Sequence, residues 1–385
     1  MKIRELLKKN SWLYAVHREM VFLKADRKSL WADAVKLFEE KRPEHGNLLD
    51  YKRSMLKHRI SIKEYNTYEF WRLNERERKN YLSERELKCI YRKTESVEEC
   101  QWFDNKLLTH KKFSKYMKRD WICPSLVSYD VFSQFVSSRD CIVKPWKGSL
   151  GIGVFLVQKG GDTDLHELYE NCRNKGLMVE ERVQSCEEMN EFHPQSLNTI
   201  RVMTMLKGEQ CKVIGCMFRM GVGEHVVDNG SAGGILAPID SDTGVIIGPG
   251  KDKDGKLYLQ HPDTGKVIKG FVVPYWDNVL EACKKMASFV PGKGIAGWDV
   301  CVLDTGEIEL IEVNSGPNIM GLQTSHGYGF GPRIQAIGMD LFGFDLMKKI
   351  SIWSRPHANY NDIMEYRRHK RDVGLLLKDY IDYEE

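Results

Sequence analysis

Two acidic residues, Asp299 and Glu312, lie in neighbouring apolar segments that both resemble β-strands, 295–303 and 307–313. If the segments pair with both carboxylates on one face, Asn314 shares that face, because side chains alternate along a strand. Two facing carboxylates should repel each other unless a cation lies between them. Three oxygen ligands with positions left for phosphate oxygens and water suit Mg²⁺. This pattern predicts a divalent-metal site.

The turn expected between these segments supports that placement. With residues 305–306 at its tip, Asp304 pairs with Glu307. An antiparallel register counted from this pair then sets Asp299 directly opposite Glu312. The alternative is a solvated face on which two acids fall by chance, but the surrounding Trp, Val, Leu and Ile residues indicate buried strands. We therefore favour the metal site.

A second cluster joins a lysine to a glycine-rich loop between strand-like segments 141–144 and 154–158. Glycines let backbone N–H groups approach a polyanion closely, and a lysine at a strand end can bind a phosphate. The loop is not GxxxxGK[ST], because no Lys-Ser or Lys-Thr follows its last glycine. It is not a dinucleotide fingerprint either, because the glycine order is reversed and a strand follows it. A tight hairpin is the alternative explanation. The candidate phosphate-binding residues are Lys144, Gly148, Ser149, Gly151 and Gly153.

Two arginines, Arg201 and Arg219, lie beside strand-like segments in the glycine-rich middle of the chain. Either can bind phosphate or carboxylate, although surface arginines are an equally good interpretation. A polar loop at 227–234 is expected to line a site. No Ser-His-Asp or Cys-His arrangement is evident, so the residues favour binding and positioning of charged groups over nucleophilic catalysis.

The composition is typical of a folded protein with two or three domains. The chain has 385 residues, of which 42% are hydrophobic and 29% charged. No apolar stretch is long enough for a membrane span, and no signal peptide follows Met1, so we expect a cytoplasmic protein. The ten cysteines are scattered without a CxxC pair, which argues against a disulfide framework or a structural zinc site.

The net charge of +4 is unevenly distributed. Residues 1–120 contain 30 Lys and Arg against 19 Asp and Glu, a balance of +11, whereas residues 121–385 contain 28 against 35, a balance of −7. The basic part could face an anionic partner such as a membrane surface. A solvated helical face is the favoured alternative, and nucleic acid is an unlikely partner because no aromatic–basic module is present.

The predicted elements change character along the chain. Residues 1–100 read as helical, and Gly46 is the only glycine before Gly148. From there strands dominate, with helices expected at 164–175 and 277–289. Further strands are expected at 176–181, 199–206 and 210–220, the last two as a hairpin, and the final forty residues look helical.

Taken in order, these motifs resemble the ATP-grasp superfamily, and most closely its sugar-transfer-associated branch, which is predicted to act in cell-surface polysaccharide biosynthesis. The similar stretch runs from about Asp104 to Gln323. Its motifs are Val143-Lys-Pro, Ser196-Leu-Asn-Thr-Ile-Arg, Val227-Asp-Asn-Gly, Gly297-Trp-Asp, Ile311-Glu-Val-Asn-Ser-Gly-Pro and Leu322-Gln323. The ordered set is specific, although no single member is.

The resemblance implies an α+β ATP-grasp fold, in which two subdomains clamp ATP and the glycine-rich hairpin forms a lid. It divides the chain into a basic helical region at 1–103, an ATP-grasp domain at 104–345 with its lid at about 140–183, and a helical tail at 346–385. Most ligases of the superfamily begin instead with a parallel α/β domain.

The resemblance also implies roles for individual residues. Lys106 and Lys144 would contact the ATP phosphates, and Asp299, Glu312 and Asn314 would hold Mg²⁺ or Mn²⁺. Arg219, with Arg201, would bind the transferring phosphoryl group as catalytic residues together with Lys144. The adenine hinge would be Glu180, Glu181 and Val183, with Glu187 or Glu188 at the ribose.

The implied function is an ATP-dependent ligase that activates a carboxylate as an acyl phosphate and joins it to an amine or a hydroxyl. One alternative is a kinase that phosphorylates a sugar hydroxyl on the same scaffold. Another is a non-catalytic nucleotide-binding partner of glycosyltransferases that docks through its basic N-terminal region. The expected substrates are a small carboxylate and an amine or sugar-linked molecule.

Overall fold

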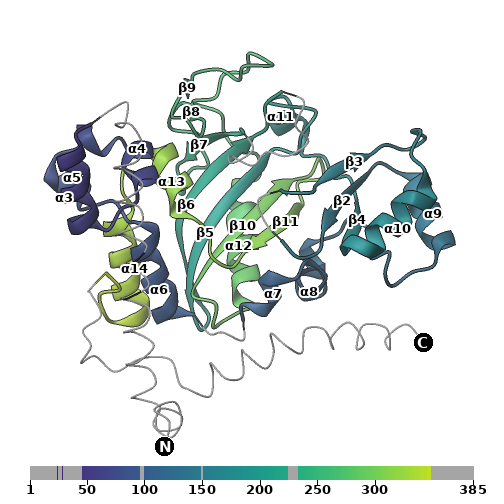
Figure 1. The fold of residues 1–385 in the computed structure, drawn as a ribbon, viewed down its shortest axis with the longest axis horizontal. Helices are drawn as coiled ribbons and strands as arrows, with labels where there is room; N and C mark the ends of the chain where they lie inside the picture. Colours follow the sequence, from purple (N-terminus) through teal and green to yellow (C-terminus); the bar gives the residue numbers. More distant parts are fainter. Residues whose placement is uncertain are drawn as a thin grey trace, which may run out of the picture.

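The computed structural model describes residues 46–95, 99–148, 151–223 and 233–347, together with Lys24 and Lys28. These residues form two antiparallel sheets with helices packed around them (Figure 1). The predicted α+β fold is therefore confirmed. The part of the chain that the structure describes contains no helix that is both long and apolar enough to cross a membrane.

The smaller sheet, called the lid sheet, has the strand order β1-β4-β2-β3. Its strands are β1 (Trp121–Ile122), β2 (Cys141–Pro145), β3 (Phe155–Val157) and β4 (Leu177–Glu181). Helices α9 (Tyr129–Ser138) and α10 (Leu165–Lys175) bury their apolar sides against it, with Phe132 and Cys172 fully buried. The hairpin of β2 and β3 around the glycine-rich loop was predicted and is present.

The larger sheet, called the central sheet, has the order β11-β10-β5-β6-β7-β8-β9. Its strands are β5 (Thr199–Lys207), β6 (Gln210–Met220), β7 (Ile235–Ile239), β8 (Gly250–Lys251), β9 (Leu257–Tyr258), β10 (Ile295–Val302) and β11 (Ile308–Asn314). Alternation along β5 sends Ile200 and Val202 to one apolar cluster and Met203 and Met205 to another. Both faces of the sheet are therefore covered.

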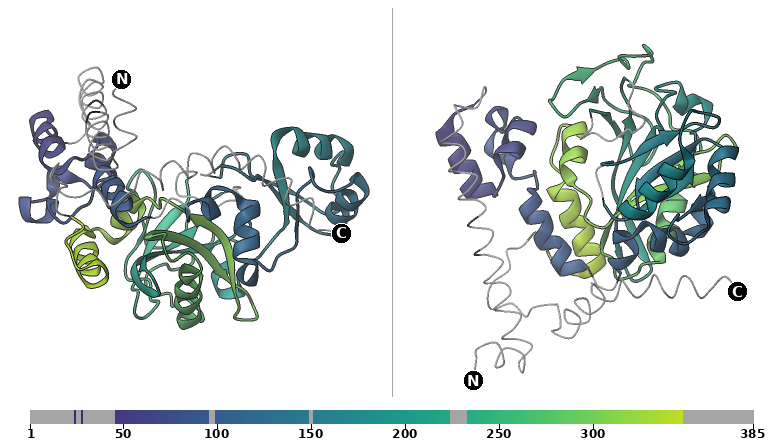
Figure 2. Two further views of the ribbon diagram at one scale, coloured as in Figure 1. Left: turned by 90° about the horizontal axis from the view of Figure 1, so that it is seen from below. Right: turned by 45° about the vertical axis from the view of Figure 1, so that its right-hand side comes forward.

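Helices on the two faces complete these clusters. Helix α12 (Trp276–Ser288) packs on the first face. Helices α6 (Glu84–Thr94), α13 (Ile319–His326) and α14 (Gly331–Phe342) contribute to the second cluster. The N-terminal helices and the lid sheet lie at opposite ends of the molecule (Figure 2).

The N-terminal region is helical where it is described, although the pattern from 62 to 91 is broken into short pieces. The remaining helices and turns are α3 (Leu48–His58), α4 (Ile62–Thr67), η1 (Phe70–Arg72), α5 (Glu75–Arg78), α7 (Gln101–Asp104), α8 (Lys106–Lys112), η2 (Ser114–Tyr116) and α11 (Glu187–Asn190). Side-chain caps explain the breaks, because Ser61, Asn74 and Ser83 each begin a new helix with a capping box. The expected helices before residue 46 and after residue 347 lie outside the described residues.

In the β10–β11 hairpin the predicted pairing of Asp299 with Glu312 is confirmed, but the turn that leads to it differs from the predicted one. Asp299 does lie opposite Glu312. The predicted turn is wrong, however, because Leu303 N–H donates to the Glu307 carbonyl and the loop holds three residues instead of two. This change moves the register by one residue, and a β-bulge at Ile311 moves it back.

Candidate active site

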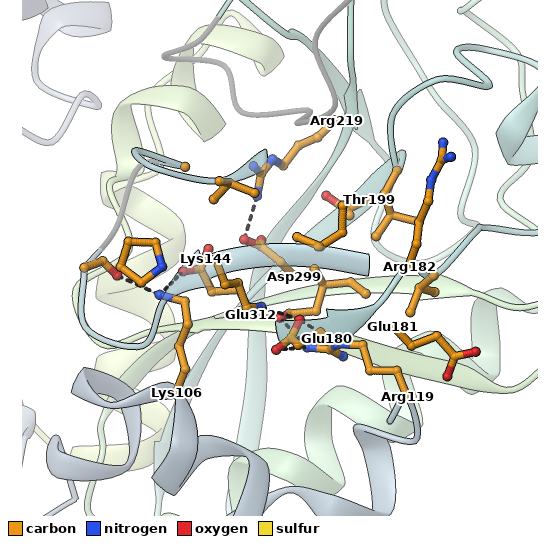
Figure 3. Close-up of a pocket in the computed structure, with 18 of the residues that line it drawn as sticks. Lys106, Arg119, Lys144, Glu180, Glu181, Arg182, Thr199, Arg219, Asp299 and Glu312 are labelled. Carbon is orange, nitrogen blue, oxygen red and sulfur yellow. Dashed lines mark hydrogen bonds and ion pairs between the residues drawn. The ribbon is translucent and has the colours of Figure 1, made fainter. Parts of the chain in front are cut away.

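A pocket opens between the lid sheet and the edge of the central sheet formed by β10 and β11 (Figure 3). Charged side chains from both sheets and from α8 converge on it. The charged lining residues are Lys106, Arg119, Lys144, Glu180, Glu181, Arg182, Arg219, Asp299 and Glu312. The pocket therefore brings together the predicted phosphate-binding lysines and the two predicted metal carboxylates.

Asp299 is buried at the pocket floor and held by two arginines. Arg201 lies opposite it on β5 and donates to both carboxylate oxygens, with Nη2 2.6 Å from Oδ2. Arg219 Nη1 on β6 is also 2.6 Å from Oδ2. Burial alone would raise the pKa of Asp299, but the two guanidinium charges outweigh burial and lower the pKa to about 2. Asp299 is thus an anion with two cationic neighbours.

Glu312 and Asn314 complete the predicted metal face. Asn314 Nδ2 lies 3.3 Å from Asp299 Oδ2, and Glu312 is 3.5 Å from Lys106 Nζ. The repulsion expected between the two carboxylates is therefore relieved by protein cations. Oxygen donors from two carboxylates and an amide fit Mg²⁺, which commonly binds one or two protein carboxylates together with substrate phosphates. No cluster of three or more His, Cys, Asp or Glu ligands occurs among the described residues.

Lys144 and Glu180 form a buried pair on adjacent strands of the lid sheet. Lys144 Nζ is 2.6 Å from Glu180 Oε2, and His110 Nε2 is 2.6 Å from Glu180 Oε1. Burial would raise the pKa of Glu180, but the charges of Arg119 and Lys144 hold it well below its usual range. These ion pairs occupy the Glu180 carboxylate, which is therefore part of a buried network of charges.

The glycine-rich loop brings backbone groups to the same pocket. Gly148, Gly151 and Gly153 all have φ between +70° and +132°, which favours glycine. Lys106 Nζ donates to the Gly148 carbonyl at 2.8 Å, so α8 and the loop meet. Gly148 and Gly151 line the pocket, whereas Gly153 packs near Pro145. Ser149 and the predicted site loop up to residue 232 lie outside the described residues.

The match to known families follows this geometry. Residues 90–339 match the family described as sugar-transfer associated ATP-grasp. The chain belongs to the sugar-transfer-associated ATP-grasp family. The resemblance deduced from the motifs is confirmed, and the match covers both sheets of this ATP-grasp protein. A comparison with curated proteins yields no match.

Several solved ATP-grasp structures are similar at low identity. An ADP complex of purK, N5-carboxyaminoimidazole ribonucleotide synthetase, is 12% identical, with TM-score 0.37, covering 57% of this chain and 46% of its own. ATP-grasp ligase PsnB with minimal precursor, Mg and ADP is 14% identical, with TM-score 0.38 and coverages of 66% and 62%. A biotin carboxylase–β-γ-ATP complex from Campylobacter jejuni is 13% identical, with TM-score 0.40 and coverages of 61% and 49%. The chain spans less than two thirds of each of these structures.

The placement of the remaining predicted residues in this ATP-grasp protein is mixed. Glu181 and Val183 line the pocket. Glu187 does not; it is exposed at the start of α11, where its N–H donates to Asp304. Arg201 and Asn314 do not line the pocket, but both donate hydrogen bonds to Asp299, which does.

Sequence reasoning missed several lining residues. The polar ones are Arg119, Arg182 and Gln195, and the apolar ones include Ile142, Ile152 and Val154. Leu197 and Thr199 also line the pocket, and they belong to the motif at 196–201, in which only Arg201 was given a role. Ile142 lies on β2 and Val154 directly before β3, the strands that flank the loop, so strand alternation offers a signal for these two. Arg119 precedes a two-residue strand and has no periodic signal around it.

Proposed function

We propose that this protein is an ATP-dependent ligase that activates a carboxylate as an acyl phosphate and joins it to an amine or a hydroxyl. The observation that carries the proposal is the pocket itself, which is lined by Lys106, Lys144, Asp299, Glu312 and Arg219. Phosphoryl transfer needs mainly positioning and charge stabilisation, and these groups supply both. Membership of an ATP-grasp family supports the same reaction class.

The residues divide the work of binding. Lys106 and Lys144 would hold the nucleotide phosphates together with backbone N–H groups of the glycine-rich loop. The apolar side chains of Ile142, Ile152 and Val154 would enclose the adenine and exclude water. Asp299, Glu312 and Asn314 would hold Mg²⁺ or Mn²⁺, which neutralises charge on the phosphate oxygens when bound.

In the activation step a substrate carboxylate oxygen attacks the γ-phosphorus of ATP, and the bond between that phosphorus and the ADP oxygen breaks. Arg219 and Arg201 would bind the equatorial oxygens of the transferring group through their planar arrays of N–H donors. The amine or hydroxyl then attacks the acyl carbon, and inorganic phosphate leaves. Arg201 and Arg219 would therefore bind Asp299 in the ligand-free protein and the transferring phosphoryl group during the reaction.

Hydroxylamine trapping tests the proposal. With a carboxylate substrate and Mg-ATP but without an amine, the enzyme should convert added hydroxylamine to a hydroxamate and release ADP in equal amount. The carboxylates screened should include sugar acids and amino acids. A stable phosphomonoester of a neutral sugar, formed without hydroxamate, would establish the kinase instead.

The cellular setting is also a proposal. The family description supports a role associated with sugar transfer, and we extend it to the making of cell-surface polysaccharide or a sugar conjugate in the cytoplasm. The basic N-terminal region would then associate with an anionic membrane surface or with a glycosyltransferase. Sedimentation with anionic vesicles, compared with neutral vesicles, tests the first of these partners.

A further inference from the structure

Arg119 joins the two sheets through one buried guanidinium whose side chain is only 3% exposed. On the lid side, Nε and Nη2 donate to Glu180 at 2.9 and 3.3 Å. On the central-sheet side, Nη1 donates to Glu309 and to the Leu310 carbonyl, both at 2.6 Å, and Nη2 donates to the Ile311 carbonyl at 3.1 Å. The five N–H groups of an arginine side chain are thus matched by five contacts.

Two of these acceptors belong to the β-bulge in β11. The extra residue, Ile311, lies between the Val300–Leu310 and Asp299–Glu312 pairs, and β11 is the edge strand of the central sheet. A bulge leaves backbone groups outside the ladder. The guanidinium of Arg119 supplies donors to two carbonyls there, so it supports the bulge that returns Glu312 to its place opposite Asp299.

On the lid side, the guanidinium of Arg119 binds the Glu180 carboxylate, and this carboxylate in turn pairs with Lys144. Glu180 accepts from Arg119 and lies 2.6 Å from Lys144 Nζ. Two buried cations, Arg119 and Lys144, therefore balance two buried anions, Glu180 and Glu309. A lysine at position 119 would keep the charge, but its donors radiate from one atom and cannot span both sheets.

We propose that Arg119 is a positioning residue that sets the placement of Lys144 on the lid sheet relative to the Asp299–Glu312 pair. Through this link one polyphosphate and its divalent cation can be bound at the same time. The inference rests on the proposed nucleotide and metal sites. The strength of coupling between nucleotide binding and metal binding should then depend on Arg119. Arg119 acts on the nucleotide side through Glu180 and on the metal side through the bulge in β11.

The test is calorimetric titration with ADP, once with Mg²⁺ and once with EDTA. The ratio of the two affinities measures coupling between nucleotide and metal. R119K should lower this ratio by about tenfold, within the usual range of coupling between sites. A merely loosened protein would instead lose both affinities equally. An unchanged ratio in folded R119K overturns the proposal.

R78K is the matched control. Arg78 also uses its whole guanidinium, donating to Asp50 at 2.7 and 2.9 Å and to the Phe70 and Leu73 carbonyls, but it lies among the N-terminal helices away from the pocket. R78K should leave the ratio unchanged, and a similar fall in R78K would overturn the proposal. If R119K does not fold, the same titrations are made with E309Q, which removes the charge of one Arg119 partner. A lowered ratio of the ADP affinities with Mg²⁺ and with EDTA would support the proposal, and an unchanged ratio would overturn it.

Failure of the proposed function is distinguishable from failure of this inference. If the wild-type protein binds no ADP, the nucleotide site is rejected, and amide hydrogen exchange in the ligand-free protein then tests the link. R119K should speed exchange in both β4 and β11, whereas R78K should not. Faster exchange in only one of these strands, or in neither, overturns the link.

Discussion

Asp299 and Glu312 face each other, yet they are neutralised in different ways. Asp299 is 3% exposed and lies between Arg201 and Arg219, whereas Glu312 is 32% exposed and lies 3.5 Å from Lys106. Asp299→Asn would leave two guanidiniums facing a neutral amide, so we expect it to lower the free energy of unfolding by about 3 kcal/mol. Glu312→Gln should change it by less than about 1 kcal/mol.

Urea denaturation of both variants checks this difference, with ADP titration as the second measurement. Both substitutions should remove the enhancement of ADP affinity by Mg²⁺, because each removes a predicted metal ligand. Asp299→Asn as stable as the wild-type protein would show that the arginines do not depend on this carboxylate. Normal Mg²⁺ enhancement in Glu312→Gln would contradict the metal site.

Arg219 offers a test of catalysis separate from binding. Arg219→Lys keeps the positive charge near Asp299 but loses the planar set of donors. Turnover should therefore fall by more than ADP affinity, because the lost hydrogen bonds are those made to the transferring group. Steady-state ADP release and calorimetric titration measure the two quantities. Equal losses in both would assign Arg219 to ground-state nucleotide binding.

The sequence alone predicts that the two acids of this site face each other, but not which cations pair with each of them. Asp299 and Glu312 are thirteen residues apart in one hairpin, and a local register argument reaches both. Arg201 reaches Asp299 only because β5 pairs with β10 across the sheet, a non-local pairing that no local pattern encodes. Arg119 was missed for the same reason, since its partners Glu180 and Glu309 lie on two different sheets.

Among the elements, the glycine-rich loop gives the clearest prediction. Gly151 has φ +70°, and a β-branched residue there would cost about 1–2 kcal/mol of local strain. Because the buried cluster of the lid sheet contains no residue of this loop, Gly151→Val should displace the loop without unfolding the sheet. ADP affinity should fall by about tenfold, the effect of losing one charge-assisted hydrogen bond.

Gly160→Val is the matched control for the loop. Gly160 also has a positive φ, +71°, but it lies in the turn after β3 with open space around it. This variant should carry similar strain and keep its ADP affinity. Equal affinity losses in the two variants would mean that strain in the lid sheet, and not the loop's approach to phosphate, accounts for the effect.

Element prediction succeeded where one periodicity dominates. Strands β2, β4, β5, β6, β10 and β11 and helices α10 and α12 were all expected. Strand β7 was missed because Pro238 within it argues against a strand. Helix α13 was missed inside an apparently polar run, although its Asn318 cap and the left-handed Gly327 that ends it are readable signals.

At the scale of the whole molecule, the lowered pKa values of buried histidines predict how the free energy of unfolding depends on pH. Burial lowers the pKa below the ordinary 6.5 for four of them, His58, His110, His261 and His326. Below pH 6.5 the unfolded chain therefore binds protons that the folded protein does not, and stability falls as the pH drops. Glu64 and Glu86, whose pKa values burial raises, oppose this trend at lower pH.

Urea midpoints at pH 7.0 and 6.0 measure this dependence, and the midpoint should be lower at pH 6.0. His261→Asn should reduce the difference, whereas a variant of the exposed His166 should keep it. A midpoint that rises on acidification would show that the raised carboxyl groups dominate instead.

The bulge at Ile311 has a consequence for how this hairpin can change over evolutionary time. A one-residue deletion in the loop at 304–306 would slip a regular hairpin by one position and turn Glu312 away from Asp299. Here β11 already contains one extra residue, Ile311, in its bulge. Loss of the bulge would therefore compensate for the deletion and keep Glu312 opposite Asp299. Loop length and bulge are therefore expected to change together among homologues, as compensating insertions and deletions that leave the facing acids in place.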